Sequence, residues 1–81
     1  MIEREKIRQR ILTHYLHGEA PENLADDTPL LGYGILNSMS ILDLVNYIET
    51  EFHFDVSAHE VNDTNFGTVR SLVAFIQRRR P

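Results

Sequence analysis

Hydrophobic residues recur along the chain with the spacing of helices. In residues 2–16 they fall at i, i+4, i+5 and i+8, which forms one apolar face: Ile7, Ile11, Leu12 and Tyr15. A second helix is predicted from Ser38 to about Phe52, with a wide apolar face of Ile41, Leu44, Val45, Ile48 and Phe52. No stretch alternates with the period of a β-strand, so the pattern predicts an all-α fold.

Two further helices are expected in the second half of the chain. Ser57-Ala58-His59-Glu60 matches a capping box and predicts a short helix. Residues 62–65 are typical of a turn, and a last helix should then run from about Phe66 to Arg79, with the apolar face Phe66, Val69, Leu72, Val73 and Ile76. The chain is therefore expected to form a four-helix bundle of three longer helices and one short helix.

A long connection, residues 17–37, separates the first two helices. Gly18 and Pro21 are expected to end the first helix. A connection of this length is unusual in a compact domain unless it is functional or partly structured. Its apolar residues indicate that it packs onto the helices: Leu24, Leu30, Leu31, Ile35 and Leu36.

Length and composition narrow the possible functions. The 81 residues suffice for a single domain, residues 1–81, which we expect to be a monomer. A net charge of −4 argues against nucleic-acid binding, and no apolar run approaches the roughly 20 residues of a membrane span. The N-terminus is charged and lacks the apolar segment of a signal peptide, so a cytoplasmic location is expected. The chain has no cysteine, so any thioester chemistry needs an imported thiol.

The most informative position is Ser38, at the start of a strongly amphipathic helix and after a glycine-bearing loop. Taken alone, Asn37 or Ser38 would be interpreted as a residue that caps the helix. The wider segment Gly34-Ile35-Leu36-Asn37-Ser38 resembles the phosphopantetheine attachment motif of acyl and peptidyl carrier proteins, which usually reads Asp-Ser-Leu. It is especially similar to free-standing carriers, including D-alanyl carrier proteins, which tend to read Gly-Leu-Leu-Asp-Ser.

This resemblance extends from about Asp27 to Ile76, through Leu44-Val45 and Asn65-Phe66-Gly67. It implies a bundle of the acyl-carrier-protein type, with 4′-phosphopantetheine from coenzyme A attached covalently to Ser38. The arm would hold an acyl or aminoacyl group as a thioester. The implied partners are a phosphopantetheinyl transferase, a loading ligase and downstream biosynthetic enzymes, and the chain itself would not be an enzyme. Fatty acyl, polyketide, aminoacyl and peptidyl cargoes all remain open.

Asn37 departs from the family pattern, because aspartate usually precedes the serine. Asparagine can cap a helix about as well as aspartate. It lacks the negative charge that would attract a basic modifying enzyme, so Ser38 could need a dedicated transferase.

The outward side of the second helix supplies the candidate partner-binding residues, which are Met39, Leu42, Asp43 and Asn46. Met39 either stays exposed, as suits partner enzymes of several shapes, or folds back onto the long loop. Asp43, Glu49 and Glu51 give the helix a mild acidity, which either faces solvent or meets basic partner surfaces.

Other functions fit the sequence less well. A helical interaction module without an arm would explain the helices equally well. A serine hydrolase is disfavoured because Ser38 is outside a Gly-x-Ser-x-Gly motif and no histidine is placed as its base. His14 and His17 lie three residues apart, but no third ligand has matching spacing for a metal. Arg78, Arg79 and Arg80 are expected to complement the dipole of the last helix.

Overall fold

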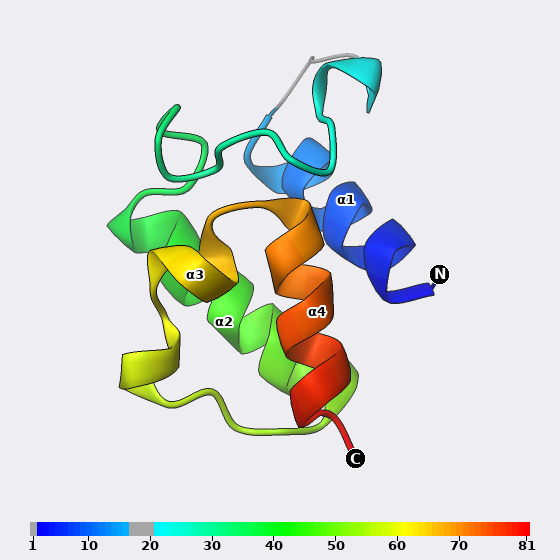
Figure 1. Ribbon diagram of the computed structural model, residues 1–81, viewed down its shortest axis with the longest axis vertical. Coiled ribbons are helices and arrows are strands. Elements are labelled where there is room, and N and C mark those ends of the chain that lie inside the picture. Colours follow the sequence, from blue (N-terminus) through cyan, green and yellow to red (C-terminus); the bar gives the residue numbers. More distant parts are fainter. Residues whose placement is uncertain (1, 17–20) are drawn as a thin grey trace.

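The computed structural model describes residues 2–16 and 21–81 (Figure 1). Its elements, in chain order, are helix α1 (Ile2–His14), the 3₁₀ turn η1 (Pro21–Asn23), helix α2 (Ser38–Phe52), the 3₁₀ turn η2 (Ala58–Glu60) and helices α3 (Asp63–Phe66) and α4 (Val69–Arg79). No strand occurs among these described residues. The predicted all-α bundle of three longer helices and one short helix is confirmed.

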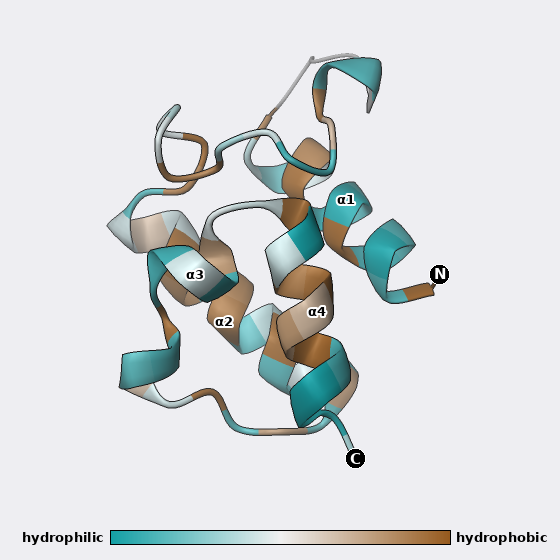
Figure 2. Cartoon of the chain, viewed as in Figure 1, coloured by the Kyte–Doolittle hydropathy of each residue, from teal (hydrophilic) through white to brown (hydrophobic). Residues whose placement is uncertain are grey.

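The three longer helices and α3 enclose one hydrophobic core. Figure 2 shows apolar residues on all three long helices and hydrophilic residues at the C-terminal end of α4. The predicted apolar faces supply most of the buried side chains: Ile7, Ile11, Leu44, Ile48, Phe52, Phe66, Val69, Leu72, Val73 and Ile76. Phe75 is also buried, and its ring centroid lies 5.9 Å from those of Phe54 and Phe66. The helical spacing therefore identified every buried apolar residue of the described helices except Phe75.

The ends of α1 and α4 differ from the prediction. Helix α1 ends at His14, because the N–H groups of Tyr15 and Leu16 both donate to the Ile11 carbonyl, at 2.9 and 3.0 Å. Gly18, which was expected to end this helix, lies outside the described residues. The last helix begins at Val69 and not near Phe66, because Thr68 caps it by accepting the Ser71 N–H at 3.0 Å.

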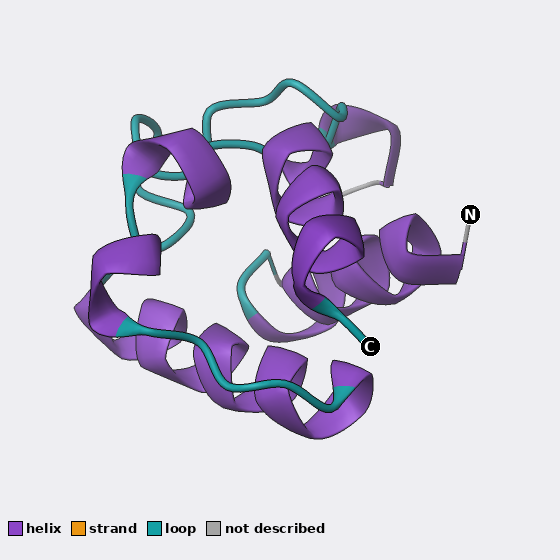
Figure 3. Cartoon of the chain, turned by 60° about the horizontal axis from the view of Figure 1, so that its bottom comes forward, coloured by secondary structure: helices purple, strands orange, loops and turns teal. Residues whose placement is uncertain are grey.

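The short helix is also placed differently. Residues 62–65 were expected to form a turn, but Asn62 caps helix α3 by accepting the Asn65 N–H at 2.9 Å. A Cβ at Gly67 would lie 2.4 Å from the Asp63 carbonyl oxygen, so only glycine fits the break between α3 and α4. The segment from Ser57 to Glu60, expected as the short helix, forms only the 3₁₀ turn η2, and Figure 3 shows the chain before it running back along α2.

The long connection before α2 packs onto the helices as predicted. Leu24, Leu30 and Leu36 are buried, and Leu31 and Ile35 are partly buried against the core. The Leu30 N–H donates to the Gly67 carbonyl at 2.8 Å, and the Arg70 N–H donates to the Asp26 carbonyl at 2.9 Å. These bonds fix the loop to the α3–α4 junction, so the chain reaches α2 from a fixed position.

The three C-terminal arginines contact side chains, which the dipole interpretation did not anticipate. Arg78 donates to Asn65 Oδ1 at 3.1 Å, and Arg79 pairs with Glu60 at 2.7 Å. Arg80 pairs at 3.1 Å with Glu3, a carboxylate that is almost completely buried. The arginines therefore attach the end of α4 to the α3 region and to α1.

Candidate functional site

The first turn of α2 is fixed by a reciprocal cap. Asn37 has extended backbone angles, and its Oδ1 accepts the Ser40 N–H at 3.0 Å. In return, the Asn37 N–H donates to Ser40 Oγ at 2.8 Å. Two of the backbone donors in this region are thereby satisfied within four residues. Asn37 is the N-cap, so Ser38 occupies the first helical position and its side chain is exposed.

The loop before this turn is closed on itself and anchored to the core. The Leu36 N–H donates to the Leu30 carbonyl at 3.0 Å, and both side chains are buried. Between them, Gly34 has φ +73°, a left-handed conformation that glycine adopts without strain. A Cβ at Gly34 would meet no atom within 4 Å, so this side of the loop is open. Ser38 thus projects from a fixed turn into open surroundings.

This turn can accommodate a phosphodiester on Ser38. The first N–H groups of a helix lack intrahelical partners, and the helix dipole makes that end positive. Both effects favour a phosphate group there. When bound, the phosphopantetheine arm supplies the thiol that this cysteine-free chain lacks.

Exposed apolar residues lie close to Ser38 in the sequence. The exposed fractions of Met39, Leu42 and Tyr33 are 78%, 64% and 75%. Met39 therefore does not fold back onto the long loop, which was the alternative. Asn46, one turn beyond Leu42, is also exposed. The outward row of α2 next to Ser38 is thus uncharged at three of the four predicted partner-binding positions and apolar at two of them, Met39 and Leu42. Tyr33 was not singled out from the sequence, because a lone tyrosine in a loop carries no pattern.

Asp43, the fourth position, is not a free surface acid. Arg10 of α1 donates to both carboxylate oxygens, at 3.0 and 2.9 Å, and the Tyr15 hydroxyl donates to Oδ2. These bonds, that of Tyr15 first and then those of Arg10, lower the pKa of Asp43. Burial, with the neighbouring Asp43 carboxylate, raises the pKa of Tyr15 to about 12, so the phenol stays protonated. The Asp43 side chain is nevertheless 46% exposed, so the carboxylate is both paired and in contact with solvent, and its role in partner binding stays a prediction.

The other two acids of α2 also have partners within the chain. Glu51 pairs with Lys6 of α1 at 2.6 Å. Glu49 accepts the Val56 N–H at 2.8 Å, which fixes the chain that returns along α2. All three acidic side chains of α2 therefore bond to other groups of the same chain. The sequence did not reveal this, because Lys6 and Glu51 are 45 positions apart.

The histidines do not gather into a metal site in the part of the chain that the structure describes. Across residues 2–16 and 21–81, no three His, Cys, Asp or Glu side chains lie close enough together to hold a metal ion. His17, which was considered together with His14, lies outside these residues. Within the same ranges, no helix combines the length and apolar character that crossing a membrane requires.

Comparison with known proteins identifies the family of this chain. Residues 15–76 match the family described as "Phosphopantetheine attachment site", a range that includes Ser38 and most of the core. The chain belongs to the phosphopantetheine-binding carrier family.

Individual relatives agree with this assignment. The carrier is 37% identical over 73 residues to the "Probable acyl carrier protein PigG" of Serratia sp. (strain ATCC 39006), covering 90% of this chain and 83% of that protein. It also resembles a chain in a structure titled "Crystal structure of FAD-dependent dehydrogenase", with a TM-score of 0.79 and 34% identity, covering 86% of this chain and 97% of that one. These matches confirm the helical fold of the acyl carrier proteins.

The family assignment decides between the functions left open by the sequence. The chain is a carrier protein that bears a 4′-phosphopantetheine arm, and it is not itself an enzyme. The interaction module without an arm is not favoured. Carriers of this family work with a phosphopantetheinyl transferase and with biosynthetic enzymes in general.

Proposed function

We propose that Ser38 carries the arm and that the arm holds an acyl or aminoacyl group as a thioester. This assignment rests on one observation: Ser38 is exposed at the first position of α2, and Asn37 caps that end of the helix. Ser40, the other serine of this turn, is engaged with Asn37 through its hydroxyl at 2.8 Å and is only half-exposed. Ser38 is therefore the better nucleophile for arm transfer.

Peptide mapping tests this assignment. Since residues 11–69 lack lysine and arginine, trypsin leaves the region in one large piece, whereas cleavage after glutamate at Glu22 and Glu49 releases residues 23–49. After incubation with a transferase and coenzyme A, fragmentation of this peptide should locate the added mass on Ser38. Added mass on Ser40 or Thr28 would contradict the assignment.

The partner enzymes are proposed to dock on the exposed row of α2 next to Ser38. Met39 and Leu42 offer apolar contact, and Asn46 offers a neutral polar group. Because Asp43 is paired with Arg10, a partner would contact the ion pair as a whole and would not meet an isolated negative charge. With Asn37 also neutral, the surface around the arm suits partners that recognise apolar shape.

We also propose a flavin-dependent dehydrogenase among the downstream enzymes. The solved chain that resembles this carrier is covered over 97% of its length, so it is of carrier size, and its structure is titled as an FAD-dependent dehydrogenase. Flavin supplies redox chemistry that a carrier lacks. A thioester would present the acyl group to such an enzyme, which would remove two hydrogens from it and pass them to the flavin.

Intact mass spectrometry can test this partner. The carrier is first loaded with each of a panel of acyl and aminoacyl groups and then mixed with a dehydrogenase of this kind. One cargo should lose the mass of two hydrogens while it remains attached to the arm. Oxidation of the same cargo as a free coenzyme A thioester, at an equal rate, would count against the carrier as the dehydrogenase's substrate.

Three further expectations belong to this proposal. Residues 1–81 are proposed to form one carrier domain, since the three longer helices share a single core. The carrier is expected to act as a monomer, and a cytoplasmic location is proposed from the sequence. Sedimentation of the purified chain would test its oligomeric state.

A further inference from the structure

Charge is divided sharply along this chain. All eight lysines and arginines lie within residues 4–10 and 70–80, whereas residues 11–69 carry ten of the 12 acidic residues and no lysine or arginine. The first range lies in α1, and the second covers α4 and its C-cap. Figure 1 shows α1 and α4 side by side, so two neighbouring helices and the C-cap of α4 carry every lysine and arginine of an acidic protein.

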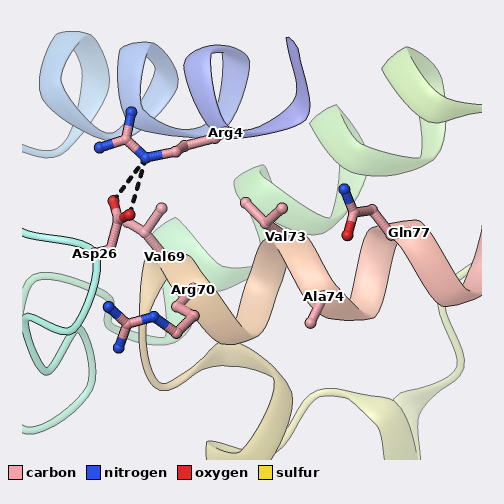
Figure 4. Close-up of a pocket in the computed structure, with 7 residues that line it drawn as sticks. All are labelled: Arg4, Asp26, Val69, Arg70, Val73, Ala74 and Gln77. Carbon is pink, nitrogen blue, oxygen red and sulfur yellow. Dashed lines mark hydrogen bonds and ion pairs between the residues drawn. The ribbon is translucent and has the colours of Figure 1, made fainter. Parts of the chain in front are cut away.

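A groove of about 310 Å³ lies between these two helices (Figure 4). Its floor is apolar and comes from α4: Val69 and Val73 are buried and Ala74 is half-buried. Figure 4 shows the guanidinium groups of Arg4 and Arg70 at one end of the groove and the Gln77 amide toward the other. The groove thus combines an apolar floor with polar groups at its ends.

The end of the groove near Arg70 has an excess of positive charge. Arg4 Nε donates to both oxygens of Asp26, each at 2.9 Å, and Arg4 also pairs with Glu5 at 3.5 Å. The bond from Arg4, with the nearby charges of Arg8 and Arg70, lowers the pKa of Asp26. Three arginines therefore stand against two carboxylates here. Arg70 is exposed, and among the described residues no carboxylate lies within ion-pair distance of it. Its charge acts on Asp26 through space but forms no direct ion pair, so the guanidinium can still bind a ligand.

We propose that the α1–α4 groove is a second docking site, which binds an acidic amphipathic helix of a partner enzyme. Apolar side chains of that helix would cover Val73 and Ala74, and its carboxylates would face Arg70 and Arg4. This site rests on the proposed function only in that the partner is an enzyme acting on the arm. It lies on helices other than α2, so a partner bound here leaves the first turn of α2 accessible.

Charge complementarity favours an acidic helix over other anions. The net charge of −4 repels nucleic acid and anionic membranes, whose charge extends over large areas. A short acidic helix instead senses mainly the cations within about 8–10 Å, the screening distance near physiological salt. The apolar floor also suits a helix, which presents apolar residues in a stripe. Holding the enzyme at this groove would raise its effective concentration at the arm.

Binding of a defined peptide tests this site. The probe is a designed 18-residue helix with a leucine stripe flanked by glutamates, added to the isotope-labelled full-length carrier with and without its arm. Nuclear magnetic resonance should show shifts in the amides of Val69 to Gln77. Arg70→Glu should weaken binding about fivefold, the scale of an exposed ion pair, and Arg70→Lys should retain most of it.

Arg78→Glu is the matched control, because it makes the same charge change on the same helix outside the groove. It should leave the affinity nearly unchanged. Equal weakening by both substitutions, or shifts confined to the first turn of α2, would overturn the proposal. So would tighter, Arg70-dependent binding of phosphatidylglycerol vesicles, of an oligonucleotide or of a second copy of the carrier. Arm addition is measured separately by mass, so a failure at Ser38 is distinguishable from a failure at the groove.

Discussion

Helix α2 divides at Asp43 into a first half, residues 38–42, and a second half, residues 44–52, which have opposite relations to the rest of the carrier. The first half presents Ser38, Met39 and Leu42 to solvent, and its cap is formed entirely by Asn37 and Ser40. The second half buries Ile48 and Phe52 and is tied to α1 and to the returning chain through Glu51 and Glu49.

Different residues of α2 therefore stabilise the fold and present Ser38 to partner enzymes. Core packing and long-range ion pairs hold the second half, whereas the side chains of Ser38, Met39 and Leu42 in the first half lie outside the core. A partner enzyme can therefore enclose Ser38 and its exposed neighbours without disturbing the bundle. Substitutions in the two halves should have different consequences, and the following predictions compare them from the largest effect to the smallest.

Leu44 and Leu42 give the sharpest test, because they are the same residue two positions apart on one helix. Leu44 is fully buried, whereas Leu42 is 64% exposed. Leu44→Ala should lower the free energy of unfolding by about 2–5 kcal/mol through lost burial and a cavity. Leu42→Ala should change it by no more than about 0.5 kcal/mol. Urea denaturation measures both, and similar losses would mean that the two halves do not differ as described.

Asp43 lies between the halves, and its contribution should depend on pH. Its pKa is lower in the folded state than its ordinary value of 3.8, so its ion pair stabilises the fold above that pH and stops doing so as the pH falls through the folded value. Because the side chain is 46% exposed, Asp43→Asn should reduce the free energy of unfolding by at most about 1 kcal/mol near neutral pH, and by progressively less as the pH falls below 3.8.

Urea denaturation at several pH values measures this effect. The matched control is Asp27→Asn, which changes an exposed aspartate in the loop and should have a smaller effect at neutral pH. A difference between wild type and Asp43→Asn that stays constant down to strongly acidic pH would contradict the role given to the carboxylate charge.

Met39→Glu should separate recognition from folding. Met39 is 78% exposed, so the free energy of unfolding should fall by less than about 1 kcal/mol. Turnover by partner enzymes should fall more, because a charge replaces an apolar contact beside the arm. A large loss of stability with normal turnover would show that Met39 belongs to the packed part of the helix.

Asn37→Asp should have the smallest effect on stability and a favourable one. The added charge lies at the positive end of the helix and should contribute about 0.3–1 kcal/mol at low salt. It should also speed arm transfer by a transferase with a basic docking surface, and salt should reduce this advantage. Initial rates at low and high ionic strength provide the measurement. Equal rates for wild type and Asn37→Asp at low salt would show that the neutral residue is no handicap.

The parts of the molecule that the sequence predicted correctly depend on nearby residues. Helical periodicity is local, so it located the core of α2 and of α4, and the short motif around Asn37 and Ser38 lay within one turn. The start of α4 was missed although a local signal existed, because Thr68 precedes Ser71 by the three residues of a cap. The apolar pattern through Phe66 concealed that signal.

The missed features join residues far apart in the chain. Arg10 and Asp43 are 33 positions apart, and nothing in the neighbourhood of either residue indicates that they meet. The acidity of α2 therefore looked available to partners when it was already paired. The burial of Glu3 was missed for the same reason. An acid in the first turn of a helix is ordinarily exposed, but Glu3 is buried and pairs with Arg80, the C-cap of α4.

The most direct test of this account is the mass gained by three forms of the full-length carrier after incubation with a phosphopantetheinyl transferase and coenzyme A. Wild type and Ser40→Ala should each gain one arm. Ser40→Ala removes the hydroxyl that accepts the Asn37 N–H, so its rate of arm addition should be equal to or lower than that of wild type. Ser38→Ala should gain none while it keeps a helical spectrum and cooperative unfolding. An equal mass gain in Ser38→Ala and wild type would contradict the assignment of the arm to Ser38.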